Sequence, residues 1–361
     1  MEKIYPEITQ QLAIKGLQSA GPLENIVLSP YAITSQIFSI IPILDNTAKG
    51  RISRFFGLRE QLKNPREFLR VWEIINLQEN NCISMDKCLW TNLIDNEAFS
   101  KRGIQVLDTL KYNCPSEFFH LINEVLDPTK QSRISLPIEN PDYYKFVSLS
   151  SLSINAPWKF QFYEALSNNS KITYHGDQGD IHCLPGLQRS AVYRSHIDSD
   201  YKLLDISFAD SMAGSSNLSL LLFAPRYRKL RDFELRFTPD FINRAIDKMI
   251  DQERAFTMPA FSIDNSYSLL DLFKNDRDLR TVFDTGFLPG LLMHQCSIKV
   301  GDGGIAPIPA KFPENTYDGP AELPSSIFFY DSPFTFFVRD RFTGVVFLAG
   351  RYVTPDKKTT G

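Results

Sequence analysis

The stretch from Lys299 to Ala310 reads KVGDGGIAPIPA, which begins like a β-strand and then becomes rich in glycine and proline. A second proline-bearing stretch follows and ends near Phe328. The apolar runs at 334–338 and 345–348 then predict a pair of strands. A long loop between strands is uncommon in a compact domain and is usually functional. Because proline has no backbone N–H, this loop cannot complete the hydrogen bonds of a central strand at its proline positions.

The composition is that of an ordinary globular protein, with 361 residues, 43% hydrophobic and 22% charged. A net charge of −3 gives no sign of a nucleic-acid or membrane partner, and no apolar run reaches membrane-spanning length. The five cysteines form no CxxC pair and predict no disulfide framework. The first residues, MEKIYPE, lack the apolar core of a signal peptide, which leaves a mature secreted form and a cytoplasmic protein both open.

Hydrophobic periodicity predicts helices that lead and strands that follow, with no linker between them. Ser29-Pro30 is typical of a helix start, with a capping serine before a first-turn proline. A strand at 255–263 contains Pro259, which suggests an edge or a bulge. The other expected helices are 7–17, 68–75, 118–126, 241–250 and 269–273, and the other strands are 25–28, 83–90, 147–154 and 218–223, with short strands dominating 181–222. The pattern predicts one α+β domain over 1–361.

Six segments in order resemble the serpin family. They are Asn25–Pro30, Trp158 with Phe162, Met258–Ile263, His294–Val300, Phe328–Phe334 and Leu348–Pro355. The resemblance implies an α+β serpin fold with three β-sheets, eight to nine helices and an exposed reactive-centre loop at about 302–327. It also implies that the loop is offered to a protease as bait, that the protein is not itself an enzyme, and that it needs no cofactor.

In inhibitory serpins the cut loop inserts as a new central strand and traps the protease as an acyl-enzyme, which requires a hinge of small residues. The hinge implied here is Asp302, Gly303, Gly304, Ile305, Ala306, Pro307, Ile308 and Pro309. Ile305 replaces a small hydroxyl residue, and Pro307 to Pro309 fall where alanines are expected. Each proline leaves a partner carbonyl unpaired at about 1–3 kcal/mol, and the two isoleucines add bulk. We expect insertion to be slower than deacylation, so that the protease is released before it can be trapped.

The large sheet departs from the family pattern in the same direction. Ser29, Trp158 and His294 match the family's positions at the breach and shutter, the two regions where that sheet opens. Ser150 stands where the family has a sheet-opening asparagine. Ala260 replaces the lysine that would pair with Asp302, and Ala32 replaces a second serine. These departures predict that sheet expansion has been lost while the scaffold persists.

Counting from Gly304 by the spacing of the family places the bait bond directly after Asp318, with Tyr317 before that residue and Gly319 after the bond. The prolines of the loop favour a stiff, extended backbone that loses little entropy on docking into a protease cleft. The expected function is an atypical serpin that inhibits a serine or papain-like cysteine protease by docking, without efficient insertion or covalent trapping. The alternative is a non-inhibitory serpin that acts as a carrier, storage or partner-binding protein.

Other motifs carry weaker signals. A basic cluster favours a solvated turn over a weak glycosaminoglycan contact; its members are Arg226, Arg228, Lys229 and Arg231. His175, His182 and Cys183 match no zinc spacing, so we expect no metal site. The chain has no Gly-x-Ser-x-Gly elbow, which argues against a hydrolase. By analogy with serpins that do not trap proteases, we expect an extracellular monomer.

Overall fold

The computed structural model describes residues 4–41, 44–58, 82–91, 105–106, 146–160, 162, 171–209, 217–284, 290–305 and 327–355. The helices expected at 68–75 and 118–126 lie outside these ranges. So do four hinge residues, Ala306, Pro307, Ile308 and Pro309, and the bait-bond residues Tyr317, Asp318 and Gly319.

The chain begins with helix α1 (Ile4–Ser19), strand β1 (Ile26–Leu28) and helices α2 (Pro30–Ile40) and α3 (Asn46–Phe55). The start of α2 is as predicted, because the Oγ of Ser29 accepts a hydrogen bond from the backbone N of Ala32 and Pro30 fills the first turn. Every residue of α2 is buried. It packs between strands of both sheets, which explains why its sequence lacks a polar face.

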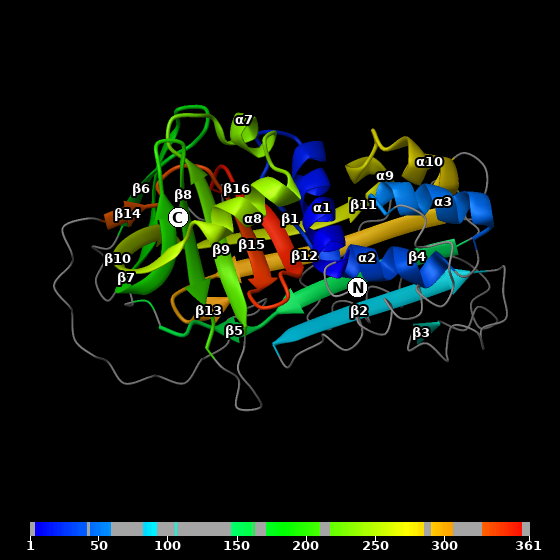
Figure 1. Ribbon diagram of the computed structural model, residues 1–361, viewed down its shortest axis with the longest axis horizontal. Coiled ribbons are helices and arrows are strands. Elements are labelled where there is room, and N and C mark those ends of the chain that lie inside the picture. Colours follow the sequence, from blue (N-terminus) through cyan, green and yellow to red (C-terminus); the bar gives the residue numbers. More distant parts are fainter. Residues whose placement is uncertain are drawn as a thin grey trace.

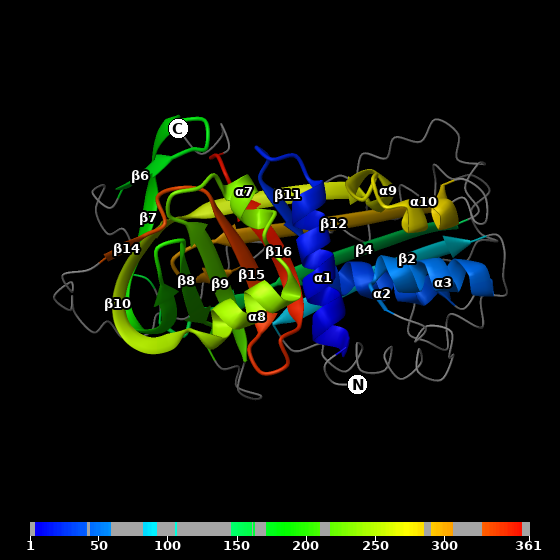
Figure 2. The ribbon, with the colours of Figure 1, turned by 45° about the horizontal axis from the view of Figure 1, so that its top comes forward.

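A seven-stranded sheet has the order β3-β2-β4-β12-β13-β5, with β11 paired to β12. Its strands are β2 (Ile83–Thr91), β3 (Gln105–Val106), β4 (Phe146–Ile154), β5 (Ala156–Pro157), β11 (Phe261–Ser268), β12 (Gly290–Val300) and β13 (Gly304–Ile305). Strands β4 and β12 are parallel and pair directly, from Gly290 opposite Phe146 to Cys296 opposite Leu152. Figure 2 shows β11, β12, β4 and β2 lying side by side. The sheet is therefore closed along this seam.

A nine-stranded sheet has the order β1-β16-β15-β9-β8-β7-β10-β14, with β6 also paired to β7. Its other strands are β6 (Lys171–His175), β7 (Ile181–Ile197), β8 (Tyr201–Ser207), β9 (Leu218–Pro225), β10 (Ile250–Pro259), β14 (Ile327–Phe329), β15 (Phe334–Asp340) and β16 (Val346–Tyr352). The expectation of short strands after 181 is wrong for β7, which runs for 17 residues because it pairs in turn with β6, β10 and β8. Because β7 pairs with all three of these strands, they belong to one sheet, and the described strands form two sheets in all.

Pro259 marks a boundary between sheets rather than a bulge inside a strand. Strand β10 ends at Pro259 and β11 begins at Phe261 in the other sheet. Between them, the backbone N of Ala260 donates to the carbonyl of Pro185. Proline suits this place because a strand that ends needs no further ladder donor.

The remaining described helices are α7 (Leu230–Glu234), α8 (Pro239–Asp247), α9 (Leu269–Leu272) and α10 (Arg277–Phe283), which makes seven helices within the described ranges. The helix expected at 241–250 ends earlier, at Asp247. Ile250 continues the helical spacing in the sequence, yet it starts β10 and is 58% exposed. Figure 1 shows α3 and α10 together at one end of the molecule and α1 crossing near β1.

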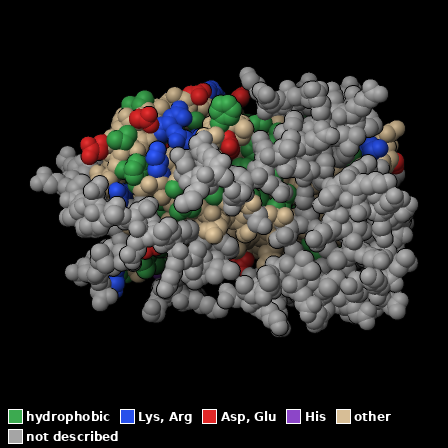
Figure 3. Space-filling model, turned by 90° about the horizontal axis from the view of Figure 1, so that it is seen from below, with side chains coloured by type: hydrophobic (Ala, Val, Ile, Leu, Met, Phe, Trp, Pro, Cys, Tyr) green, Lys and Arg blue, Asp and Glu red, His purple; other side chains and the backbone are tan. Residues whose placement is uncertain are grey.

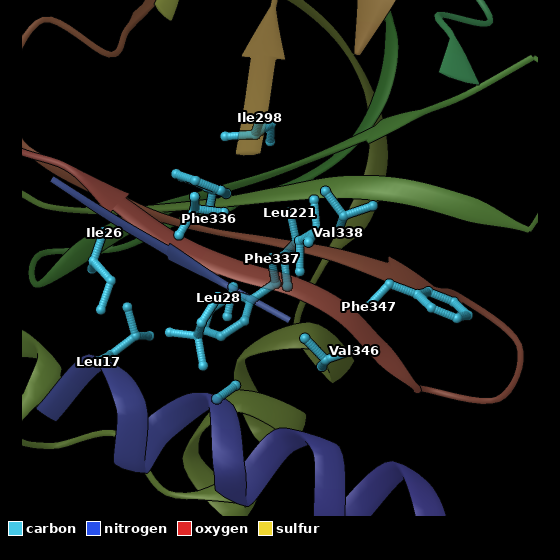
Figure 4. Packing of buried hydrophobic residues seen from close by; sticks show 14 of the residues in the cluster. Leu17, Ile26, Leu28, Leu221, Ile298, Phe336, Phe337, Val338, Val346 and Phe347 are labelled. Carbon is cyan, nitrogen blue, oxygen red and sulfur yellow. The ribbon is translucent and has the colours of Figure 1, made fainter. Parts of the chain in front are cut away.

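The core fills the space on both faces of the nine-stranded sheet. All of β9 and β16 is buried. In Figure 4, Phe336 of β15 lies on the face toward Ile298 of β12, whereas its neighbour Phe337 lies on the face toward Leu28. This alternation follows from the two-residue period of a strand. Side chains on one face of β15 therefore pack against the other sheet, and those on the opposite face pack toward the N-terminal helices.

Candidate functional site

The described part of the hinge enters the seven-stranded sheet. Strand β13 pairs antiparallel with both of its neighbours: Ile305 lies opposite Val300 of β12 and opposite Ala156 of β5. The carbonyl of Gly304 also accepts a hydrogen bond from the backbone N of Gly301, at 3.0 Å. The first hinge residues thus already form a short strand between the end of β12 and the continuation of β4.

Trp158 holds this segment from the side. Its backbone N donates to the carbonyl of Gly303 at 3.0 Å, and its indole Nε1 donates to the carbonyl of Gly301 at 2.8 Å. The backbone N of Phe162 donates to the carbonyl of Asp302 at 3.2 Å. The buried indole stacks on Phe208 with 4.8 Å between ring centroids. Trp158 is therefore both a core residue and the main support of the hinge.

Gly304 occupies a position that no other residue fits. Its φ is +155°, and a Cβ built there would lie 2.3 Å from the carbonyl oxygen of Ala156 and 2.8 Å from the Cα of Pro157. Both atoms belong to backbone and cannot rotate away. The hinge glycine is required for the close approach of β13 to β5.

Ile305 corrects one expectation from the sequence. Its bulk was expected to oppose insertion, yet the side chain is 1% exposed and belongs to the hydrophobic core. The large side chain is accommodated because it enters the apolar interior rather than meeting another strand. It anchors the hinge at this point.

Asp302 has a local partner in place of the expected lysine. It is exposed, and its Oδ1 accepts a hydrogen bond from the backbone N of Gly303 at 2.8 Å. Ala260, which takes the lysine position, packs partly buried against the core. None of the ion pairs found among the described residues includes Asp302.

Below the hinge, a buried polar network joins α2 to the seam between β4 and β12. His294 lies directly opposite Ser150 across the seam, and its Nδ1 is 2.9 Å from the Oγ of Ser150. Its Nε2 accepts a hydrogen bond from the backbone N of Ser29, also at 2.9 Å. The structure therefore brings Ser29 and His294 into contact and adds Ser150 to them, whereas Trp158 belongs to the hinge contact above.

His294 is a neutral imidazole in this network. Complete burial lowers its pKa to about 3, and Nε2 must stay unprotonated because it accepts a hydrogen bond from the backbone N–H of Ser29. The ring hydrogen then resides on Nδ1 and is donated to Ser150. Protonation of Nε2 would break the bond to the start of α2.

Gln36 is the member of this site that sequence reasoning missed. The side chain is 1% exposed; its Nε2 donates to the carbonyl of Ser148 at 2.9 Å and to that of Met293 at 3.0 Å. Its Oε1 accepts from the Oγ of Ser150 at 2.8 Å. The available signal was a glutamine within a helix that has no solvent-facing side, because a buried amide needs several partners.

The basic cluster is largely tied up in local contacts. Arg228 pairs with Asp200 at 3.1 Å, and Arg226 donates to the carbonyl of Asp198 at 2.9 Å. Arg231 donates to the carbonyl of Leu17 at 3.1 Å, near the C-terminal end of α1, where cationic groups are favourable. Lys229 is exposed at the N-cap of α7. Three of the four side chains therefore have structural partners.

Other site types find no support among the described residues. No group of three His, Cys, Asp or Glu side chains there could hold a metal ion. The described histidines that contact a carboxylate do so in pairs, His182 with Asp180 and His196 with Asp198. Within the same ranges, no helix combines the length and apolar character that a membrane crossing requires.

A comparison with known families identifies this arrangement. The family profile described as "Serpin (serine protease inhibitor)" matches residues 8–355. The chain belongs to the serpin family. Serpins are in general inhibitors or binding proteins rather than catalytic enzymes, so the family assignment leaves the choice between these two roles open.

The curated relatives are distant. A plasma serine protease inhibitor of Bos taurus is 22% identical over 367 residues, covering 94% of this chain and 88% of the relative. An uncharacterised serpin-like protein of Thermococcus kodakarensis is 22% identical over 253 residues, covering 67% of this chain and 57% of that relative's own length.

Two solved structures share the fold at low identity. Human thyroxine-binding globulin superposes with a TM-score of 0.79 and 16% identity, covering 98% of this serpin and all of that chain. Native protease nexin-1 with heparin superposes with a TM-score of 0.75 and 18% identity, again covering 98% of this serpin and all of that chain. At these identities the similarity establishes the serpin fold, as the sequence predicted, and nothing finer.

Proposed function

We propose that this serpin presents its loop as bait and inhibits a serine or papain-like cysteine protease by reversible docking, while the seam between β4 and β12 stays closed. It would act as a single-domain monomer outside the cell and would not be an enzyme. The observation that carries the proposal is the register of β13, because it fixes which partners the following loop residues would meet on insertion.

Extending that register places prolines at two successive inward positions. Ile305 lies opposite Val300, and each step along the loop moves the partner one residue back along β12. Pro307 would come between Ile298 of β12 and Ile154 of β4. Pro309 would come between Cys296 and Leu152, two residues that now pair directly.

The same register identifies the hydrogen bonds that insertion would forfeit. Trp158 donates to Gly303 on the β5 side, so odd-numbered loop residues would direct their backbone N toward β4. Pro307 and Pro309 have no hydrogen there. The carbonyls of Ile154 and Leu152 would each stay buried without a donor, at about 1–3 kcal/mol apiece.

A lysine adds a larger obstacle two positions later. In this register Lys311 would come between Ser150 and His294, and its side chain would face the core as that of Ile305 does. The groups at this place are neutral: the ring of His294, the amide of Gln36, the hydroxyl of Ser150 and the backbone of both strands. Burial of an ammonium group without a carboxylate costs several kcal/mol or forces it to lose its proton.

Slow insertion leaves docking as the route to inhibition. A covalent trap forms only when insertion outpaces deacylation, so a protease that cuts this loop would be released. A stiff proline-rich segment can still occupy a protease cleft, because little conformational entropy is lost. The bait bond proposed for such docking lies at Tyr317, Asp318 and Gly319.

Incubation of the full chain with a panel of serine and papain-like cysteine proteases tests this function. We expect reversible inhibition, with an inhibition constant that does not tighten with time, and no SDS-stable complex. A covalent complex with any protease would contradict the docking mechanism. Cleavage or indifference across the whole panel would instead favour the second function.

The second function is a non-inhibitory carrier, storage or partner-binding role. It is supported by the same obstacles to insertion and by the fold likeness to thyroxine-binding globulin. A glycosaminoglycan contact at the basic cluster has less support, because three of its four side chains already have partners. On the face shown in Figure 3, the described Lys and Arg side chains likewise stand beside acidic and hydrophobic ones.

A further inference from the structure

We infer that Gln36 is the latch that holds β4 and β12 together and so limits how far the hinge can enter the sheet. This inference rests on the proposed function, because it names what keeps the sheet closed below Ile305. Gln36 is a positioning residue, since it acts on the seam and does not touch a protease.

The latch is a single amide that bridges two strands. Its Nε2 donates one hydrogen to the carbonyl of Ser148 on β4 and the other to the carbonyl of Met293 on β12. These residues come just before the pair of Ser150 and His294 on their two parallel strands. Any strand inserted between β4 and β12 must separate the two carbonyls and so break at least one of these bonds.

The latch is fixed in place because every hydrogen in the network has an assigned acceptor. His294 donates from Nδ1 to Ser150, and Ser150 donates to the Oε1 of Gln36. Ser29 donates from its backbone to Nε2 of His294, which ties the network to the first turn of α2. Gln36 therefore cannot flip its amide without placing its NH₂ group against the hydroxyl hydrogen of Ser150.

The amide of Gln36 takes the place of one that the family resemblance leads us to expect at position 150. The resemblance places an asparagine at position 150, where an amide would come from the sheet itself. Here Ser150 has only a hydroxyl, which is bonded to Gln36 and His294. The amide instead comes from α2, which is buried along its whole length. The seam is thereby tied to a helix that does not belong to the sheet.

Opening the seam therefore carries a cost beyond that of the strand ladder. Both carbonyls and the amide lie in the interior, where water does not reach to replace a lost partner. The hinge can occupy the end of the seam at Val300 without disturbing Gln36. Further entry reaches the latch at Met293 and Ser148.

Hydrogen exchange of the uncut, full-length protein tests the latch. In Gln36→Met, which keeps the length of the side chain and removes the amide, backbone amides of Ser148–Leu152 and Met293–Cys296 should exchange at least about tenfold faster relative to those of β9. The matched control is Thr34→Val. It removes a buried hydrogen bond of the same helix, from Oγ1 to the carbonyl of Pro30 at 2.7 Å, without touching the seam.

Equal acceleration in the two variants, or none in Gln36→Met, would overturn the inference. A compensating substitution provides a second test. The variant Gln36→Ala should speed exchange along the seam. Adding Ser150→Asn to that variant should restore slow exchange, because the asparagine supplies an amide from β4. A failure to restore it would also overturn the role of the amide. Should Gln36→Met not fold, Gln36→Glu keeps the acceptor and removes the donor, and the same comparison applies. Because no protease is present, failure of the docking mechanism would leave these outcomes unchanged.

Discussion

At the scale of single residues, the hinge depends on one glycine whose missing side chain allows two strands to touch. Gly304→Ala should expel β13 from the sheet, because the new Cβ would meet backbone atoms of Ala156 and Pro157 at an unfavourable φ. We expect a loss of about 2 kcal/mol in the free energy of unfolding and faster proteolysis within 301–305. Chemical denaturation and limited proteolysis measure both effects.

The matched control is Gly301→Ala, since a Cβ at Gly301 meets nothing within 4 Å. It should leave both stability and proteolysis unchanged. If the two variants behaved alike, the insertion of Gly304 and Ile305 into the sheet would not describe the protein in solution.

At the scale of elements, His294 joins the start of α2 to the seam, and its buried neutral ring makes that junction sensitive to acid. Its pKa is lowered from 6.5 to about 3 by burial, so the unfolded chain takes up a proton at a higher pH than the native protein does. The contribution of the neutral His294 ring to the free energy of unfolding is therefore complete above pH 6.5 and is lost as the pH falls toward 3.

Between pH 7.5 and pH 4.5, the free energy of unfolding should fall by about 2–3 kcal/mol more in the wild type than in His294→Gln. Urea denaturation at the two pH values measures this difference. Comparison with the variant removes the contribution of carboxylates, which titrate in both proteins. An identical pH dependence of the two proteins would show that the ring is not held neutral.

The elements also show what sequence reasoning could reach. Strands β2, β4 and β9 and the capped start of α2 were predicted nearly in place, because their signals are local: alternation, an apolar run, and Ser29-Pro30. The end of α8 was missed because helical spacing continues to Ile250 after the backbone has turned. Gln36 was missed for a different reason: its partners lie on strands more than 100 residues away in the chain.

At the scale of the whole molecule, the proposed mechanism leaves the sheet closed throughout, with no later insertion of the loop. Pairing of β4 with β12, the latch at Gln36 and the two prolines all oppose a new central strand. The pairing of Ile305 shows that the first hinge residues can enter the sheet, so the proposed obstacles begin further along the hinge, at Pro307. Cutting the loop should therefore change the thermal stability of the protein little.

The thermal midpoint of the intact chain, compared with that of the chain cut within 312–326, tests this claim most directly. A suitable positive control is Pro307→Ala/Pro309→Ala/Lys311→Ala, which removes the obstacles proposed within the loop itself, so that cleavage should raise the midpoint. For the wild-type chain the closed-sheet mechanism predicts midpoints within about 5 °C of each other. A rise of about 20 °C or more on cleavage would mean that the loop has become a strand of the sheet, and would contradict it.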